Sequence, residues 1–417
     1  MTSALVHERG ARRAWGIPPW RLAFGAVIAG LGLWLSWACL GVGLPGWRAD
    51  SAQGLTEAAQ DRLDAARTPA DRAVAADLAR RALQRGPLSV APLRVLGVAA
   101  QDSGRMAEAR TLMAAAGARS RRDVLTQAWL FDDALTRADP TALYDTADVL
   151  LRVEPDIGRI VFPPMVGVAR DPAATPLLVR RLALQPAWRS GFLRLLAARG
   201  DAGVAFQVLE ALKGAPGGVK DEETGYLVRR LIDDGDYPRA YLVWASLLPL
   251  SGRTRLGYLY NGDFAAAPGP PPFNWNLAAA TDVVAEVAAP PAGPPTRALH
   301  VRFAPTGAKP LASQFLLLRP GAYRLSGSLY IDGQADDGQL VWAVACATDE
   351  HTRIAEIDQG GAGGVWRRFA ADFTVPAGCA AQQLLLSGRA GEGFDPVSAW
   401  YANLRLERIS GPRGGGA

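Results

Sequence analysis

Apolar and polar residues follow three successive patterns along the chain, and the first is an apolar run, Leu22–Leu44, without a charged side chain. About 20 apolar residues suffice to cross a bilayer as a helix. Arginines precede the run, whereas Arg48 alone follows it closely, and this bias predicts a cytoplasmic N-terminal segment, 1–21. We expect an uncleaved, single-pass signal anchor in the inner membrane, with most of the chain in the periplasm or extracytoplasmic space. A cleaved signal peptide is the alternative, but its apolar stretch is shorter.

The second pattern, over residues 52–250, repeats with the period of an α-helix. Leu78, Ala79, Ala82 and Leu83, for example, fall on one helical face. Prolines punctuate the region at what we expect to be helix boundaries. The pattern predicts about eight to ten helices that form an α-solenoid.

One stretch of this region resembles a tetratricopeptide repeat, since small and bulky residues take the positions where two antiparallel helices touch. These positions are Leu93, Leu96, Gly97, Ala100, Gly104, Ala109 and Ala116. The resemblance implies a concave surface that holds a protein partner. A spacer that lifts the C-terminal part off the membrane is an equal alternative.

The third pattern, over residues 256–410, alternates with the period of a β-strand. In Gly321–Asp332, the alternation places Tyr323 on one face and Tyr330 on the other. In Ser398–Arg408, the same count places Trp400 with the core residues and Tyr401 opposite them. About eight to ten such strands predict an antiparallel β-sandwich. The tail, 411–417, is too poor in apolar residues to be ordered.

The two ends of this region resemble the jelly-roll carbohydrate-binding modules that accompany glycoside hydrolases. The opening motif is Asn261-Gly262-Asp263-Phe264, and the closing strand reads Trp400-Tyr401-Ala402-Asn403-Leu404-Arg405-Leu406. The resemblance implies a jelly-roll fold and a carbohydrate ligand. Family members often hold a structural calcium ion between the first and last strands. Here Asn403 stands where an acidic residue is usual, so we assign no metal and no cofactor.

The candidate glycan-binding residues combine aromatic rings with planar polar groups on the outward face of the sandwich. They are Arg324, Tyr330, Trp366, Arg368, Tyr401 and Arg405. Aromatic faces pack against the C–H patches of sugars, and planar polar groups bond their hydroxyls. The alternative is an ordinary solvated sheet face with scattered aromatic residues, or a protein-binding face.

Two cysteines, Cys346 and Cys379, follow the apolar run. An even number of cysteines in an oxidising compartment predicts a disulfide, and two buried free thiols are the alternative.

The formal net charge is +5, but basic residues are interspersed with acidic ones and form no stripe. We therefore exclude nucleic acid as a partner.

Motifs for catalysis are not found in the sequence. The chain has 3 histidines, and none stands at the spacing of a metal site, while nucleophile-elbow and P-loop motifs are missing. We expect a non-enzymatic, membrane-anchored envelope protein, a scaffold or glycan-binding accessory factor in the assembly or export of surface polysaccharide or exopolysaccharide. A protein-interaction scaffold without glycan binding and an unrecognised glycan-active enzyme are the alternatives.

Overall fold

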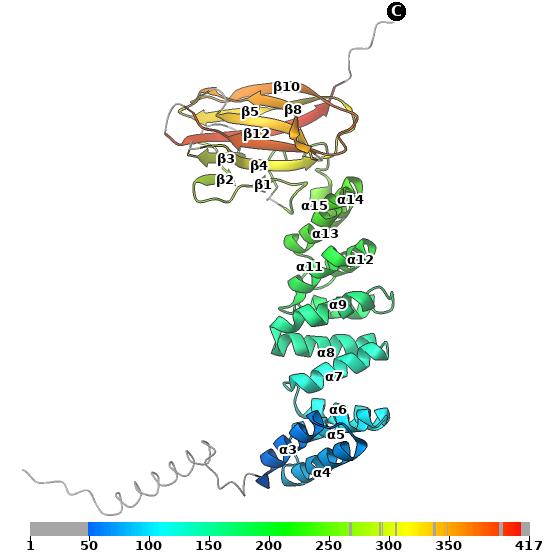
Figure 1. Ribbon diagram of the computed structural model, residues 1–417. Coiled ribbons are helices and arrows are strands. Elements are labelled where there is room, and N and C mark those ends of the chain that lie inside the picture. Colours follow the sequence, from blue (N-terminus) through cyan, green and yellow to red (C-terminus); the bar gives the residue numbers. More distant parts are fainter. Residues whose placement is uncertain are drawn as a thin grey trace, which may run out of the picture. The chain divides into compact units, whose positions relative to one another are not determined.

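The computed structural model describes residues 49–409, apart from 267–268, 292, 294, 305–306, 337–338, 348 and 392–394. Along these residues the chain forms helices first and strands afterwards (Figure 1). The helices are α3 (Ala52–Asp64), α4 (Pro69–Arg85), α5 (Ala91–Asp102), α6 (Met106–Arg119), α7 (Val124–Thr136), α8 (Pro140–Val153), the 3-10 helix η1 (Pro155–Ile157), α9 (Gly158–Val168), α10 (Thr175–Ala183), α11 (Arg189–Arg199), α12 (Ala202–Lys213), α13 (Asp221–Asp233), α14 (Tyr237–Leu247) and α15 (Leu250–Arg253).

The strands form two five-stranded antiparallel sheets and one two-stranded sheet within the described residues. Sheet 1 has the order β1-β4-β11-β7-β8, sheet 2 has the order β10-β5-β12-β3-β2, and β6 pairs with β9. The strands are β1 (Asn276–Leu277), β2 (Val283–Ala288), β3 (Ala298–Phe303), β4 (Lys309–Leu316), β5 (Gly321–Asp332), β6 (Gln334–Ala335), β7 (Leu340–Cys346), β8 (Asp349–Asp358), β9 (Gly361–Ala362), β10 (Arg367–Val375), β11 (Gln382–Gly388) and β12 (Val397–Arg408).

The fold class expected from the sequence is corrected in one respect, which is the transmembrane helix. Of the helices between residues 49 and 409, none is both long enough and apolar enough to cross a bilayer. The longest of them, α4, has 17 residues and alternates alanines with arginines and aspartates. The apolar run Leu22–Leu44, the segment 1–21 before it and the tail 411–417 lie outside the described residues. The fold is therefore a helical part followed by a β part.

Helix boundaries follow from capping side chains and from prolines. The hydroxyl of Thr68 accepts a hydrogen bond from the Asp71 amide (3.2 Å), and the Asp71 carboxylate accepts one from the Thr68 amide (3.1 Å). This capping box starts α4, and Pro69 fits its first turn because the amide hydrogen that proline lacks has no helical partner there. Pro163 and Pro164, by contrast, lie inside α9.

The chain divides into two compact units, one that ends at Leu130 and one that begins at Phe131, so the division falls inside α7. In the first unit, α3, α4 and α5 pack through small side chains. The fully buried alanines of this cluster are Ala59, Ala75 and Ala79. Helices of this unit are present as expected, while their identity as tetratricopeptide repeats stays a prediction.

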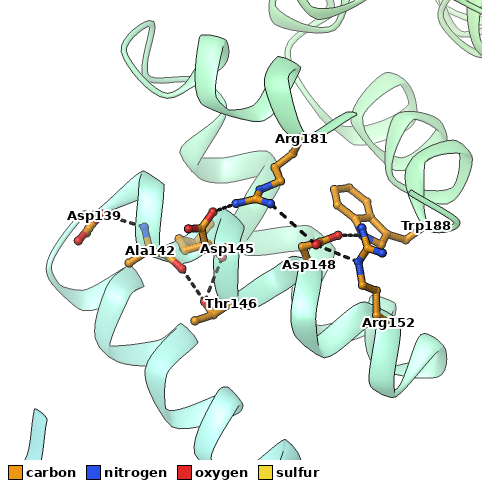
Figure 2. A network of polar contacts seen from close by, with 9 residues as sticks. Asp139, Ala142, Asp145, Thr146, Asp148, Arg152, Arg181 and Trp188 are labelled. Atoms are coloured by element: carbon orange, nitrogen blue, oxygen red, sulfur yellow. Dashed lines mark hydrogen bonds and ion pairs between the residues drawn. The ribbon is translucent and has the colours of Figure 1, made fainter. Parts of the chain in front are cut away.

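In the second unit, a polar network joins α8, α10 and the start of α11 (Figure 2). Asp148 of α8 accepts hydrogen bonds from Trp188 Nε1 (3.0 Å) and from Arg152 Nε (2.9 Å). Arg181 of α10 pairs with Asp145, which lies about one turn before Asp148 on α8. The network therefore fixes the indole of Trp188, which directly precedes α11, against α8.

A buried ion pair joins α11 to α13. The side chains of Arg189 and Glu223 are 3% and 0% exposed, and the guanidinium reaches both carboxylate oxygens at 2.7 and 2.6 Å. Arg189 also donates to the carbonyl oxygens of Leu182 (3.0 Å) and Gly218 (2.7 Å). A buried charge pair is tolerated when such additional hydrogen bonds satisfy it.

The core of the β part lies between sheets 1 and 2. Tyr323, Leu325, Leu329 and Ile331 of β5 are all buried in it, as the alternation predicts. Trp342 of β7 fills the opposite side and is fully buried. Because successive residues of a strand point to opposite faces, the residues between them form the outer faces of the two sheets.

The opening motif and the closing strand of the β part contact each other. The amide of Leu404 donates to the carbonyl oxygen of Gly262 (2.8 Å), and a Cβ at position 262 would lie 2.1 Å from the Leu404 oxygen. Beside this contact, Asn403 has a φ of 52°, and the register of β12 against β5 shifts between Ala402 and Arg405. The contact therefore lies beside a β-bulge. Glycine is needed at position 262 because the backbone of Leu404 approaches so closely.

The disulfide expected between Cys346 and Cys379 is confirmed, with a Cα–Cα distance of 5.5 Å. It joins the end of β7 to the segment that precedes β11. Beside it, Gln382 donates to the Cys379 carbonyl oxygen (2.8 Å) and accepts from the Leu318 amide (2.9 Å). The bridge and these bonds hold one end of sheet 1.

Candidate functional site

Four rings form a transverse row on the outer face of sheet 2, and we call them the aromatic row. They are Trp366, Tyr330, Trp400 and His300. Cross-strand register brings them together, because Trp400 of β12 is opposite Tyr330 of β5 on one side and His300 of β3 on the other. Trp366 directly precedes β10, the strand that pairs with β5 on its other edge.

The rings of the aromatic row contact one another. The ring centroids of His300 and Trp400 are 4.3 Å apart with an interplanar angle of 15°, so these two rings stack. Tyr330 lies 5.8 Å from Trp400 and 5.8 Å from Trp366. Offset and edge contacts at such distances are favourable. The row is therefore one continuous aromatic surface rather than four scattered rings.

Exposure differs along the row. Trp400 is 9% exposed and packs with the buried Ala298 and Ala402, whereas Tyr330 and Trp366 are half-buried. The indole nitrogen of Trp400 is buried without a hydrogen-bond partner among the described residues. Tyr330 and Trp366 are thus the rings that can meet a ligand, and the buried Trp400 packs against Tyr330 from the neighbouring strand.

Planar polar groups border the row on both sides. His300 Nδ1 lies 3.4 Å from Glu286, and His300 Nε2 lies 3.1 Å from the hydroxyl of Ser398. One register step along the sheet, the exposed Arg368 is opposite Ser328. Asp332 occupies the step on the other side, opposite Ser398. These groups offer both donors and acceptors close to the rings.

The structure brings together three of the six residues predicted from the sequence, which are Tyr330, Trp366 and Arg368. Arg324 lies on the same face of β5 but six residues from Tyr330, which is about 20 Å along a strand. Its guanidinium pairs with Asp372 at 2.6 and 2.7 Å, and this hydrogen bond lowers the pKa of the Asp372 carboxyl. Arg405 is exposed on this face as well, opposite Ser326, between the two ends.

The placement of Tyr401 on the outer face is wrong. Tyr401 is fully buried in the core, 5.4 Å from Trp342, and burial raises the pKa of its phenol. The physical reason is the bulge at Asn403, because one extra residue there reverses the alternation on its N-terminal side. Trp400 takes the outward position instead, while Leu404 and Leu406 point inward as predicted.

Sequence reasoning missed Trp400 and His300 as members of the row. Asn403 could have indicated the outward position of Trp400, because asparagine tolerates the left-handed conformation found at this bulge. Alternation along β3 puts His300 on the face opposite Leu299 and Val301, but its stacking on Trp400 depends on strand order. Strand order cannot be read from alternation.

Among the described residues, no group of three or more His, Cys, Asp and Glu side chains is arranged to hold a metal ion. Around the row the charges are mixed, with Arg368 and Arg302 near Asp332 and Glu286. The arrangement can hold a flat, hydroxyl-rich, uncharged molecule.

No protein-family model and no curated protein matches the chain. Solved structures similar to its β part include carbohydrate-binding modules. TmCBM61 in complex with β-1,4-galactotriose is 17% identical with a TM-score of 0.26, over 37% of this chain and 99% of that chain. The CBM22-1 xylan-binding domain of Paenibacillus barcinonensis Xyn10C is 12% identical with a TM-score of 0.27, over 36% and 93%. A family 16 carbohydrate-binding module is 12% identical with a TM-score of 0.23, over 30% and 85%. Values this low carry no argument about a ligand.

Proposed function

We propose that the β part binds a neutral glycan across the aromatic row of sheet 2. The observation that carries the proposal is the continuity of the row, in which cross-strand register and ring contacts place Trp366, Tyr330 and Trp400 side by side. Sugar rings present C–H faces that pack on such surfaces, and their hydroxyls need donors and acceptors around them. Arg368 and Asp332 supply these beside the two accessible rings.

A neutral rather than a charged glycan is favoured by the balance of charge around the row. On one side of the aromatic row, Arg302 and Asp332 share a register row through Ser398. Glu286 ends the aromatic row beside His300, and Arg368 lies one register step to the other side of the row. An anionic polymer would meet two carboxylates, and a cationic one would meet two guanidinium groups. Like charges close together cost free energy, so a ligand without net charge fits best.

A glycan array tests the proposal, with the full chain and its Trp366→Ala variant applied to neutral polysaccharides. We expect binding by the wild type and a loss of at least tenfold in the variant, which corresponds to about 1.4 kcal/mol. Leu385→Ala is the matched control, since Leu385 is a half-buried side chain on the outer face of sheet 1. Failure of the wild type to bind any neutral glycan would contradict the proposal.

We further propose that binding is the whole activity and that the protein is an accessory factor in the assembly or export of an envelope polysaccharide. The row supports this proposal, because its rings and the flanking Arg368 and Asp332 can hold a glycan by stacking and hydrogen bonding alone. The Ser398 hydroxyl and the Glu286 carboxylate both contact His300 beside these rings, so turnover has to be measured directly. Incubation of the bound glycan with the protein, followed by chromatography of the products, is the test. Cleavage or transfer would show an enzyme instead.

A further inference from the structure

The helical part carries a groove between α9 and α11 whose volume is about 810 Å³. Three arginines line it, Arg159 from α9 and Arg194 and Arg199 from α11, and we call it the arginine groove. Arg199 also lines an adjoining hollow of about 220 Å³, which adds Arg170 from the segment after α9. Four guanidinium groups therefore lie along one continuous surface.

These arginines are exposed, and none of the four has an ion-pair partner in the part of the chain that the structure describes. On the neighbouring elements, Arg181 and Arg189 are both paired. Asp156 is the one carboxylate among the lining residues of the arginine groove. The surface thus has a net positive charge that would attract an anion.

An aromatic ring, Phe162, forms part of the lining. The ring is half-buried, and two glycines border it: a Cβ at Gly158 would lie 2.9 Å from the ring and one at Gly191 would lie 3.5 Å from it. Phe192 and Trp188 hold the ring from behind, with centroids 5.8 and 6.4 Å away. The hydrogen bond from Trp188 to Asp148 in Figure 2 fixes that support.

A proline inside α9 lies at the edge of the groove. Pro163 lies inside α9 and has no amide hydrogen, so the carbonyl oxygen of Arg159 loses its usual helical donor. Both residues line the groove. A helix-interior proline destabilises a helix, and a carbonyl oxygen left without its donor can accept a hydrogen bond from a ligand.

We propose that the arginine groove binds a polysaccharide of uronic acids. One such sugar residue carries a carboxylate for a guanidinium group and a C–H face for Phe162. An acidic peptide would satisfy the arginines as well, but it supplies no ring face at each carboxylate. Guanidinium groups bind carboxylates in a bidentate manner, which gives the arginines their preference for this anion.

The proposal does not rest on glycan binding by the β part, and the test separates the two. Affinity electrophoresis of the full chain would use polygalacturonate, neutral galactan and poly-L-glutamate as probes. We expect retardation by polygalacturonate that weakens as salt is raised, because salt screens exposed charges. Trp366→Ala should leave this retardation unchanged.

The decisive variants replace the groove's charge and its ring separately. Arg194→Gln with Arg199→Gln should weaken polygalacturonate binding at least tenfold, and Phe162→Leu should weaken it several-fold. Arg121→Gln with Arg122→Gln is the matched control, since both arginines are exposed in the α6–α7 connection. No retardation by polygalacturonate would overturn the proposal. So would poly-L-glutamate binding of equal strength that is unaffected by Phe162→Leu, which would identify an acidic peptide as the occupant.

Discussion

The outer faces of the two sheets are built alike but present different chemistry. Across sheet 1, one transverse row reads Ser313, Leu385, Ala343 and Glu356. Across sheet 2, the aromatic row continues to Glu286 of β2 and consists of Trp366, Tyr330, Trp400, His300 and Glu286. Both sheets have five strands and share one core, so the fold alone does not explain the difference. The rings of the aromatic row contact one another across the outer face of sheet 2, an arrangement that suits the proposed carbohydrate ligand.

The two sheets also differ in the interactions that stabilise them. Sheet 1 is tied at one end by the Cys346–Cys379 bridge, whereas the aromatic row of sheet 2 depends on strand register and on the bulge at Asn403. The comparison therefore separates the stability of the β part from the geometry of its proposed binding face. Each can be changed without the other.

The largest effect is expected from removal of the disulfide. Cys346→Ala with Cys379→Ala opens a loop whose ends are 33 residues apart, which should lower the free energy of unfolding by about 3–4 kcal/mol in the chain-entropy model. Denaturant unfolding with and without reductant measures it. Glycan binding at low denaturant should persist, because the bridge contacts sheet 1. Loss of binding in a folded variant would show that the two faces are not independent.

A smaller effect is expected at the bulge that turns Trp400 outward. Asn403→Val places a β-branched residue at a φ of 52°, where it is strained, and should cost roughly 1–3 kcal/mol of stability. Asn403→Gly is the control and should be tolerated, since glycine adopts this conformation freely. Equal stability of the two variants would mean that the left-handed conformation does not maintain the bulge.

The smallest effect is expected at the Arg324–Asp372 pair, far along the same face. The hydrogen bond from Arg324 lowers the pKa of Asp372 below the unfolded value of 3.8, so the pair contributes stability above that pH and loses it as the pH falls through the folded pKa. Arg324→Gln should remove this small contribution at neutral pH and change nothing in strong acid. Thermal melts at both pH values measure it. Because the pair is exposed, glycan binding should be unaffected.

The sequence allowed much of this arrangement to be predicted, and the exceptions have physical causes. Period-two alternation placed Tyr323 inside and Tyr330 outside because β5 is a regular strand. The same rule failed at Tyr401 because the bulge inserts one extra residue into β12. Alternation counted back from Leu404 therefore assigns every residue before the bulge to the wrong face. Period-two alternation thus predicts which face each residue of a regular strand occupies, but it does not locate a β-bulge.

The arginine groove could not be predicted from the sequence at all. Arg159 and Arg194 are far apart in the chain, and their meeting depends on how α9 packs against α11. The two glycines beside Phe162 are equally distant from each other, at positions 158 and 191. Only Pro163 and Pro164 give a local signal, since prolines usually lie at helix boundaries and these two lie inside α9. A rule broken in this way is a useful indication of function.

The most direct test of the central claim is a calorimetric titration of a neutral glycan into two double variants, one for each face. Tyr330→Ala with Trp366→Ala removes the accessible rings of sheet 2, and Gln383→Ala with Leu385→Ala trims the outer face of sheet 1. The account predicts that the first variant loses binding at least tenfold and that the second binds like the wild type. Loss of binding in the second variant alone would contradict it and assign the glycan to sheet 1.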